Sequence, residues 1–191
     1  MVIKKLYLDP FLDMFNGEIL TYCISKTPSA ASVLSAQQQA IAITSDCPYR
    51  RTFHSDRGWA YQMGAYSSAL KENKIFQSMS RKGNCYDNSV MENFFGILKQ
   101  EMYYGTTYYS FDELKEAIER YIKYYNETRM KEKLGWMSRV GGADIFLDYQ
   151  YNQSKNMSAP PSIAAIKLLR YKKSNFLGSH HFLHRNFFRL Y

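Results

Sequence analysis

Two carboxylates, Asp56 and Glu92, have the sequence surroundings that best fit a chemical role. Asp56 follows a short β-prone run, and Glu92 lies at the start of an apolar helical pattern. A carboxylate at a strand end and another on a helix can meet over one divalent cation. Oxygen ligands suit Mg²⁺ or Mn²⁺ and phosphoryl chemistry. The pair therefore predicts a metal site, although each residue alone is more typical of an ordinary surface helix or turn.

Basic residues near Glu92 could bind a phosphate backbone. Lys99 is seven residues after Glu92, so a helix would bring both to nearly the same face, with Phe95 on the stripe between them. Arg81 and Lys82 lie in a Gly-containing polar loop before this helix, where they could follow the phosphates of a nucleic acid. An ordinary polar connector explains this loop equally well.

The elements that must position these residues alternate between strands and helices. Residues 3–14 and 18–25 are expected to form strands joined at Asn16-Gly17, because both turn residues tolerate positive φ. The other expected elements are a helix over 29–42, a strand over 51–55, a helix over 61–73, a strand over 74–79, a helix over about 89–103, and a helix over 110–126 opened by a capping box. This order predicts an α/β layered domain.

The positive charge of the chain is unevenly distributed. The net charge is +8; residues 1–138 carry 17 Lys and Arg against 15 Asp and Glu, whereas residues 139–191 carry 8 against 2. From Arg139 onward, Gly and Pro pairs and scattered aromatic residues replace regular periodicity. We therefore expect a core over 1–138 and an irregular basic tail over 139–191. The basic excess fits DNA, although a solvated basic surface explains it equally well.

Several common protein classes are disfavoured by the sequence. Cys23, Cys47 and Cys85 are widely spaced and form no C-x-x-C motif, which favours free thiols in a reducing compartment. No apolar run approaches 18 residues, and the N-terminus shows no secretory signal. We therefore expect a cytoplasmic protein without a membrane span.

Several stretches together closely resemble one family, the integrase-type catalytic core of bacterial insertion-sequence transposases. This is the group whose second reading frame resembles retroviral integrase. The similar stretches are residues 54–61, 77–88, 92–99, 124–129 and 133–134, with the early hairpin around 6–19. The resemblance covers about residues 4–138 and implies a ribonuclease-H-like mixed sheet flanked by helices.

The resemblance also implies a mechanism. In this family, an Asp, a second Asp and a Glu hold two Mg²⁺ (or Mn²⁺) ions, which activate water or a DNA 3′-hydroxyl for in-line displacement. By motif match, Asp56 is the second Asp, Glu92 is the Glu, and Lys99 is the basic residue two helical turns later. The implied partners are the element ends, the target DNA, further copies of the chain, or full-length transposase.

The first family Asp has no match in this sequence. In the family it lies in a Thr-Asp run on a central strand before the hairpin, and this sequence begins at the hairpin. Asp9 and Asp13 match hairpin positions instead. Without that strand, the hairpin strands are expected to lack a neighbour for their backbone groups.

The C-terminal end departs from the family too. Where the family usually continues Ser-Pro-x-Glu-Tyr-Arg, this chain changes character after Ser138. Both departures predict a truncated and rearranged transposase fragment that is inactive in strand transfer. A non-catalytic DNA-binding or interfering fragment, and a poorly folded product of a decayed gene, are the alternatives.

Overall fold

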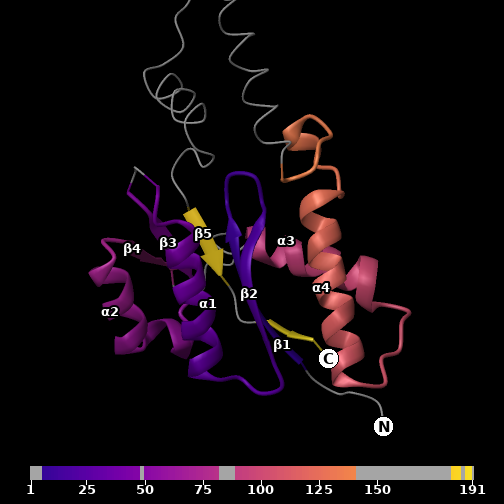
Figure 1. The fold of residues 1–191 in the computed structure, drawn as a ribbon, viewed down its shortest axis with the longest axis horizontal. Coiled ribbons are helices and arrows are strands. Elements are labelled where there is room, and N and C mark those ends of the chain that lie inside the picture. The colour runs from indigo at the N-terminus through magenta and orange to yellow at the C-terminus, as the bar shows by residue number, and fades with distance from the viewer. Residues whose placement is uncertain (1–5, 48–49, 82–88, 141–181, 186–187, 191) are drawn as a thin grey trace, which may run out of the picture.

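One mixed β-sheet, with two helices packed on each face, makes up the computed structural model of the chain (Figure 1). The structure describes residues 6–47, 50–81, 89–140, 182–185 and 188–190. The strands are β1 (Leu6–Asp13), β2 (Ile19–Ser25), β3 (Thr52–Ser55), β4 (Phe76–Met79), β5 (Phe182–Arg185) and β6 (Phe188–Leu190). The helices are α1 (Ala30–Ile43), α2 (Gly64–Glu72), α3 (Ser89–Leu98) and α4 (Phe111–Glu127).

Strands β1 and β2 form the expected antiparallel hairpin. The Gly17 N–H donates to the Asp13 carbonyl at 2.8 Å, and the Asp13 N–H donates to the Glu18 carbonyl at 2.8 Å. Gly17 has a φ of +81°, a conformation that strains residues with a Cβ. The Asn16 side chain accepts the Glu18 N–H at 2.9 Å. The predicted Asn16-Gly17 turn is therefore confirmed.

Helices α1 and α2 cover one face of the sheet. α1 begins after Ser29, whose hydroxyl accepts the Ser32 N–H at 3.0 Å, as a helix N-cap does. Their apolar residues pack with strand residues in one buried cluster, which contains Phe11, Val33, Ala36, Ala40, Ile41, Phe53, Ala60, Tyr61, Tyr66, Leu70 and Ile75. The cluster ties the hairpin to β3.

Helices α3 and α4 cover the opposite face. The Ser110 hydroxyl accepts the Glu113 N–H at 3.1 Å, while the Glu113 carboxylate accepts the Tyr109 N–H at 2.8 Å, so the expected capping interaction opens α4. The apolar residues of this face form a second buried cluster: Leu6, Leu8, Leu12, Ile19, Met91, Phe94, Phe95, Leu98, Leu114, Ile118, Tyr121, Ile122 and Tyr125.

The middle of the sheet is built partly from the C-terminal end of the chain. The strand order is β2-β1-β5-β3-β4, and β6 also pairs with β1. β5 is antiparallel to β1 and parallel to β3, and β3 is parallel to β4. The region expected to be an irregular tail thus contributes two short strands, and the position beside β1 that the sequence left without a strand is filled.

Candidate active site

Asp56 directly follows β3, at the end of the strand. Because β3 and β4 are parallel, their carboxyl ends lie at one edge of the sheet, which is where open α/β sheets place ligands. The half-buried Asp56 side chain accepts the Gly58 N–H at 2.7 Å through Oδ1. A Cβ at Gly58 would lie 2.9 Å from that oxygen, so this turn leaves little room for a larger residue.

Polar contacts hold the same edge together. The two ring nitrogens of His54 contact the Ser78 hydroxyl at 2.9 Å and the Ser80 hydroxyl at 3.1 Å. Arg57 donates from Nε to the Ser80 carbonyl at 3.0 Å. His54 therefore links β3 to β4 and to the residue that follows it. Arg81 follows at this edge with an exposed side chain.

Glu92 lies on the exposed side of the first turn of α3, and Lys99 is half-buried at the end of the same helix. Phe95, expected on their shared stripe, is 0% exposed and packs in the core. The expectation for Phe95 is therefore wrong, because α3 turns a wide apolar face toward the sheet and that face includes this position. Lys82 lies outside the described residues.

The carboxylates do not form a complete metal-ligand set within the described part of the chain. There, no three His, Cys, Asp or Glu side chains gather closely enough to hold a metal ion. Asp13 is buried and accepts the Phe15 N–H at 2.8 Å, so it serves the hairpin turn. Asp9 is 1% exposed within β1. Asp56 and Glu92 are thus a candidate pair of ligands, and no catalytic step follows from them alone.

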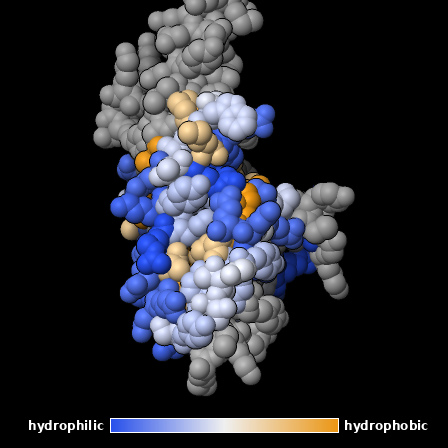
Figure 2. Space-filling view, turned by 90° about the vertical axis from the view of Figure 1, so that its right-hand side faces the viewer, coloured by the Kyte–Doolittle hydropathy of each residue, from blue (hydrophilic) through white to orange (hydrophobic). Residues whose placement is uncertain are grey.

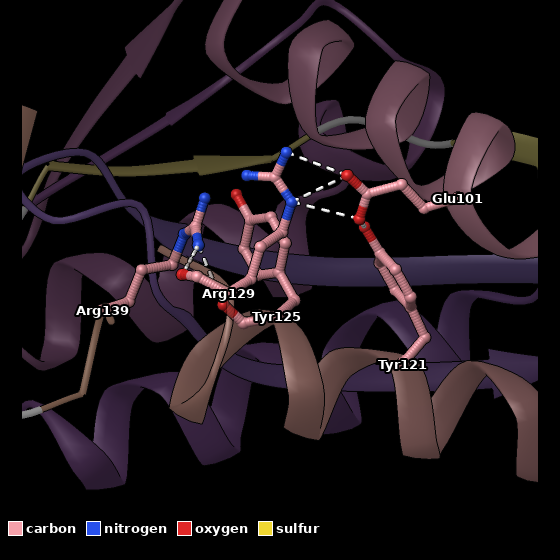
Figure 3. Close-up of polar contacts among 5 residues, drawn as sticks. All are labelled: Glu101, Tyr121, Tyr125, Arg129 and Arg139. Atoms are coloured by element: carbon pink, nitrogen blue, oxygen red, sulfur yellow. Dashed lines mark hydrogen bonds and ion pairs between the residues drawn. The ribbon is translucent and has the colours of Figure 1, made fainter. Parts of the chain in front are cut away.

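A cluster that the sequence did not predict lies at the end of α3. The helix continues into a π-helical turn, Lys99–Tyr103, in which the Tyr104 N–H donates to the Lys99 carbonyl at 2.8 Å. Within this turn, Glu101 accepts the Tyr121 hydroxyl at 2.9 Å (Figure 3). Its carboxylate also accepts Arg129 Nε at 2.9 and 3.1 Å and lies 2.9 Å from Nη2. We call these three side chains the Glu101 clamp.

The clamp changes the proton affinities of its members. Burial acts to raise the pKa of Glu101, but the hydrogen bonds from Arg129 and Tyr121 outweigh it and leave that pKa below its ordinary value. Burial and the neighbouring carboxylate raise the pKa of Tyr121. The hydrogen bond to Glu101 raises the pKa of Arg129. At neutral pH the clamp is therefore a carboxylate held by a phenol and a guanidinium.

Arg139 lies beside the clamp, next to Tyr125 (Figure 3). It is 3% exposed, and its guanidinium lies 3.6 Å from the centre of the Tyr125 ring. Nη1 donates to the Tyr125 carbonyl at 2.9 Å and to the Arg129 carbonyl at 3.1 Å. Burial lowers the pKa of the Arg139 guanidinium. Carbonyls at the end of α4 are satisfied in this way by a side chain that follows the helix.

The face shown in Figure 2 is mostly hydrophilic, with a few small apolar patches. The large exposed side chains at the C-terminal end of α4 and just beyond it are Tyr124, Met130, Trp136 and Val140. Among the described residues, none of the helices combines the length and the apolar character needed to cross a lipid bilayer.

The fold defines the class of protein first. A mixed sheet with helix pairs on both faces is the ribonuclease-H-like arrangement of integrase catalytic cores. The structure matches the HTLV-2 integrase catalytic core in complex with magnesium with a TM-score of 0.50 at 17% identity, covering 67% of this chain and 78% of that one. It matches the BIV integrase catalytic core with a TM-score of 0.51 at 18% identity, covering 74% and 86%.

Sequence comparison then gives the family. Two family models described as integrase core domain match residues 2–85 and 92–141. An uncharacterized transposase-like protein of Haemophilus influenzae is 46% identical over 136 residues, which are 71% of this chain and 62% of that protein. The putative transposase InsK of insertion sequence element IS150 from Escherichia coli is 46% identical over 138 residues, 72% and 48% of the two chains.

The chain belongs to the integrase-type transposases of bacterial insertion sequences, with an integrase-like catalytic core. It spans 62% and 48% of the lengths of these two curated relatives. The expected family and the expected ribonuclease-H-like fold are thereby confirmed.

Proposed function

We propose that this chain carries a DNA transposase core whose nucleic-acid surface lies where β3, β4 and α3 present Asp56, Arg81 and Glu92. The observation that carries the proposal is 46% identity over 136 and 138 residues to transposase-like proteins, combined with the integrase-like fold. DNA, as element end and as target, is the substrate that this assignment implies.

Each proposed site residue has a separate role. Asp56 and Glu92 are metal ligands, and Mg²⁺ or Mn²⁺ bound there would stabilise the attacking and leaving oxygens of a phosphodiester. Lys99, Arg81 and Lys82 bind phosphates and hold the DNA backbone in place. The position of Asp56 at the shared carboxyl edge of two parallel strands supports this division.

The third acidic ligand of the family has no match within residues 1–191. Two carboxylates bind a metal more weakly and stabilise less transition-state charge than three. We therefore expect the chain to bind DNA but not to join strands. It would then act as a DNA-binding fragment, alone, with further copies of itself, or by co-assembling with full-length transposase.

DNA binding tests the phosphate contacts. Removal of one phosphate contact should lower the slope of log affinity against log salt by about 1. We expect this for Lys99→Ala and Arg81→Ala, measured by fluorescence anisotropy with a labelled duplex carrying an element end. Lys115→Ala is the matched control, because Lys115 faces Glu119 on the exposed side of α4. Equal slopes for all variants would refute the assigned surface.

Metal binding tests the carboxylates. Mn²⁺ titration followed by electron paramagnetic resonance should detect weak binding that Asp56→Asn and Glu92→Gln each reduce by about tenfold or more. Asp46→Asn, at an exposed position outside the proposed site, should leave binding unchanged. Efficient strand joining by the unaltered chain with Mg²⁺ or Mn²⁺ would overturn the expectation of inactivity.

A further inference from the structure

The C-terminal strands pair with both ends of β1 in one register. At one end of β1, Leu12 pairs with His184; nearer the other end, Leu8 pairs with Phe188. The offset between paired residue numbers is the same for β5 and β6, so the two strands share one register with β1. A shift of one residue would turn every side chain to the opposite face, so a constant register indicates specific pairing.

The same segment also binds β3. Each residue of β5 pairs with one of β3, from Thr52 opposite Phe182 to Ser55 opposite Arg185, in a parallel ladder without irregularity. In the strand order, β5 is what separates the β1–β2 pair from the β3–β4 pair. Within the described residues, the ladder that connects these two halves of the sheet therefore runs through the C-terminal segment.

The position that this segment occupies is the interior of the molecule. β1 is buried over nearly its full length, and Thr52, Phe53 and Ser55 of β3 are buried as well. The N–H and C=O groups of these strands are far from bulk water, so they require a hydrogen-bonding partner in the fold. β5 pairs with both strands at once: all four of its residues pair with β3, and Leu183 and His184 also pair with β1.

We propose that the space between β1 and β3 is a strand-acceptor groove, filled by residues 182–185 of the same chain, and that residues 188–190 extend the pairing along β1. Its ligand is an extended peptide that runs antiparallel to β1 and parallel to β3, with apolar residues opposite Leu6 and Leu8. The segment 139–191 thereby acquires a role that the proposed DNA site does not supply: its far end completes the core. Strand addition of this kind obtains affinity from backbone hydrogen bonds and specificity from alternate side chains.

Disulfide trapping tests the register in the full chain. In a background with Cys23, Cys47 and Cys85 replaced by Ala, the pair Tyr7→Cys and Arg189→Cys should oxidise rapidly within one chain. Directly opposed residues of antiparallel strands lie within disulfide reach. Mass spectrometry of a tryptic digest identifies the linked peptides.

The matched control moves one cysteine along the same strand. Tyr7→Cys with Arg185→Cys separates the thiols by four residues, or about 13 Å along the strand, which exceeds disulfide reach. Rapid oxidation of the first pair with slow oxidation of the second supports the groove. Equal rates overturn it, and links found between chains rather than within one overturn the assignment of the occupant.

A proline substitution in β5, and its rescue by a synthetic peptide, test whether the stability of the core depends on this strand. Leu183→Pro removes a backbone N–H from β5 and should lower the thermal midpoint by on the order of 5–10 °C. A synthetic peptide of residues 180–191 should restore the midpoint of this variant, whereas a scrambled peptide should not. Leu183→Ala, which keeps the backbone N–H of β5, is the control and should lower the midpoint by less. An unchanged midpoint for Leu183→Pro, or equal rescue by both peptides, would contradict the proposal.

Discussion

The Glu101 clamp and the edge that carries Asp56 use polar side chains in opposite ways. In the clamp, one carboxylate receives bonds from a phenol and a guanidinium, and Arg139 satisfies the helix end below it. Glu92 is exposed in the first turn of α3, and Asp56, directly after β3, accepts the Gly58 N–H through Oδ1. The clamp residues bind one another and support the fold, whereas Asp56 and Glu92 are the proposed metal ligands.

This difference shows that α3 is held in place at one end and exposed to solvent at the other. The end of α3 is fixed to α4 through Glu101, while its first turn presents Glu92 to solvent. Helix π turns often occur at functional sites, and here the π turn places Glu101 in the clamp two residues after Lys99. Substitutions in the clamp should therefore change stability, and substitutions at the edge should change ligand binding.

Replacement of Arg139 should have the largest effect on stability. Arg139→Met leaves the buried carbonyls of Tyr125 and Arg129 without this donor and removes the guanidinium from the Tyr125 ring. We expect a loss of about 2–4 kcal/mol in the free energy of unfolding, measured by urea denaturation. Arg120→Met, whose side chain is 73% exposed beside Glu116, should cost less than about 0.5 kcal/mol. Equal losses of unfolding free energy for the two variants would show that Arg139 contributes no more to stability than an exposed arginine.

Neutralisation of Glu101 should have a smaller effect. Glu101→Gln retains an acceptor for Tyr121 but loses the charge that faces Arg129, so we expect a loss of about 1 kcal/mol at pH 7 in urea denaturation. Glu116→Gln, in an exposed pair with Arg120, is the matched control. A loss no greater than that of the control would show that the clamp contributes little.

The same variant should change the pH dependence of stability. Folding lowers the pKa of Glu101 below its ordinary value of 4.5, so the stabilisation is complete above that value. It is lost as the pH falls through the lower pKa of the folded state. The difference in unfolding free energy between wild type and Glu101→Gln should therefore shrink between about pH 5 and pH 3. A difference that stays constant or grows on acidification would contradict the assigned ionisation.

Substitutions at the edge should have the smallest effect on stability. Asp56→Asn keeps an oxygen that can accept the Gly58 N–H, and Glu92→Gln alters an exposed side chain. Each should change the free energy of unfolding by less than about 0.5 kcal/mol while it weakens Mn²⁺ binding. A loss of more than about 2 kcal/mol in the free energy of unfolding for either variant would show that the residue mainly stabilises the fold.

Features set by local chemistry could be predicted from the sequence. The Asn16-Gly17 turn and the Ser110 capping interaction depend on residues a few positions apart, and the structure contains both. The helix over 29–42 was predicted as well, and the structure adds Ser29 as its cap. Asp56 at a strand end and Glu92 in a helix were predicted in the same way, from local pattern and motif.

Features set by distant partners could not be predicted in this way. Glu101 and Arg129 are 28 residues apart, and no periodicity links a π turn to the residue after a helix. The pairing of Leu12 with His184 joins the two ends of the chain, and β5 is too short for its pattern to indicate a central strand. The sequence does not distinguish Glu101 from Glu92. Glu101 becomes part of the clamp only through its contacts with Tyr121 and Arg129 in the folded chain.

The central position of β5 and β6 affects how the protein must be made. A ribosome releases the hairpin and the α1–α2 unit long before residues 182–190 leave its exit tunnel. Until then, β1 and β3 cannot be bridged, and their backbone edges are open to other newly made chains. Closure of the sheet is therefore a late event in the synthesis of the chain, and chaperone demand should be highest for ribosome-bound chains arrested before Phe182.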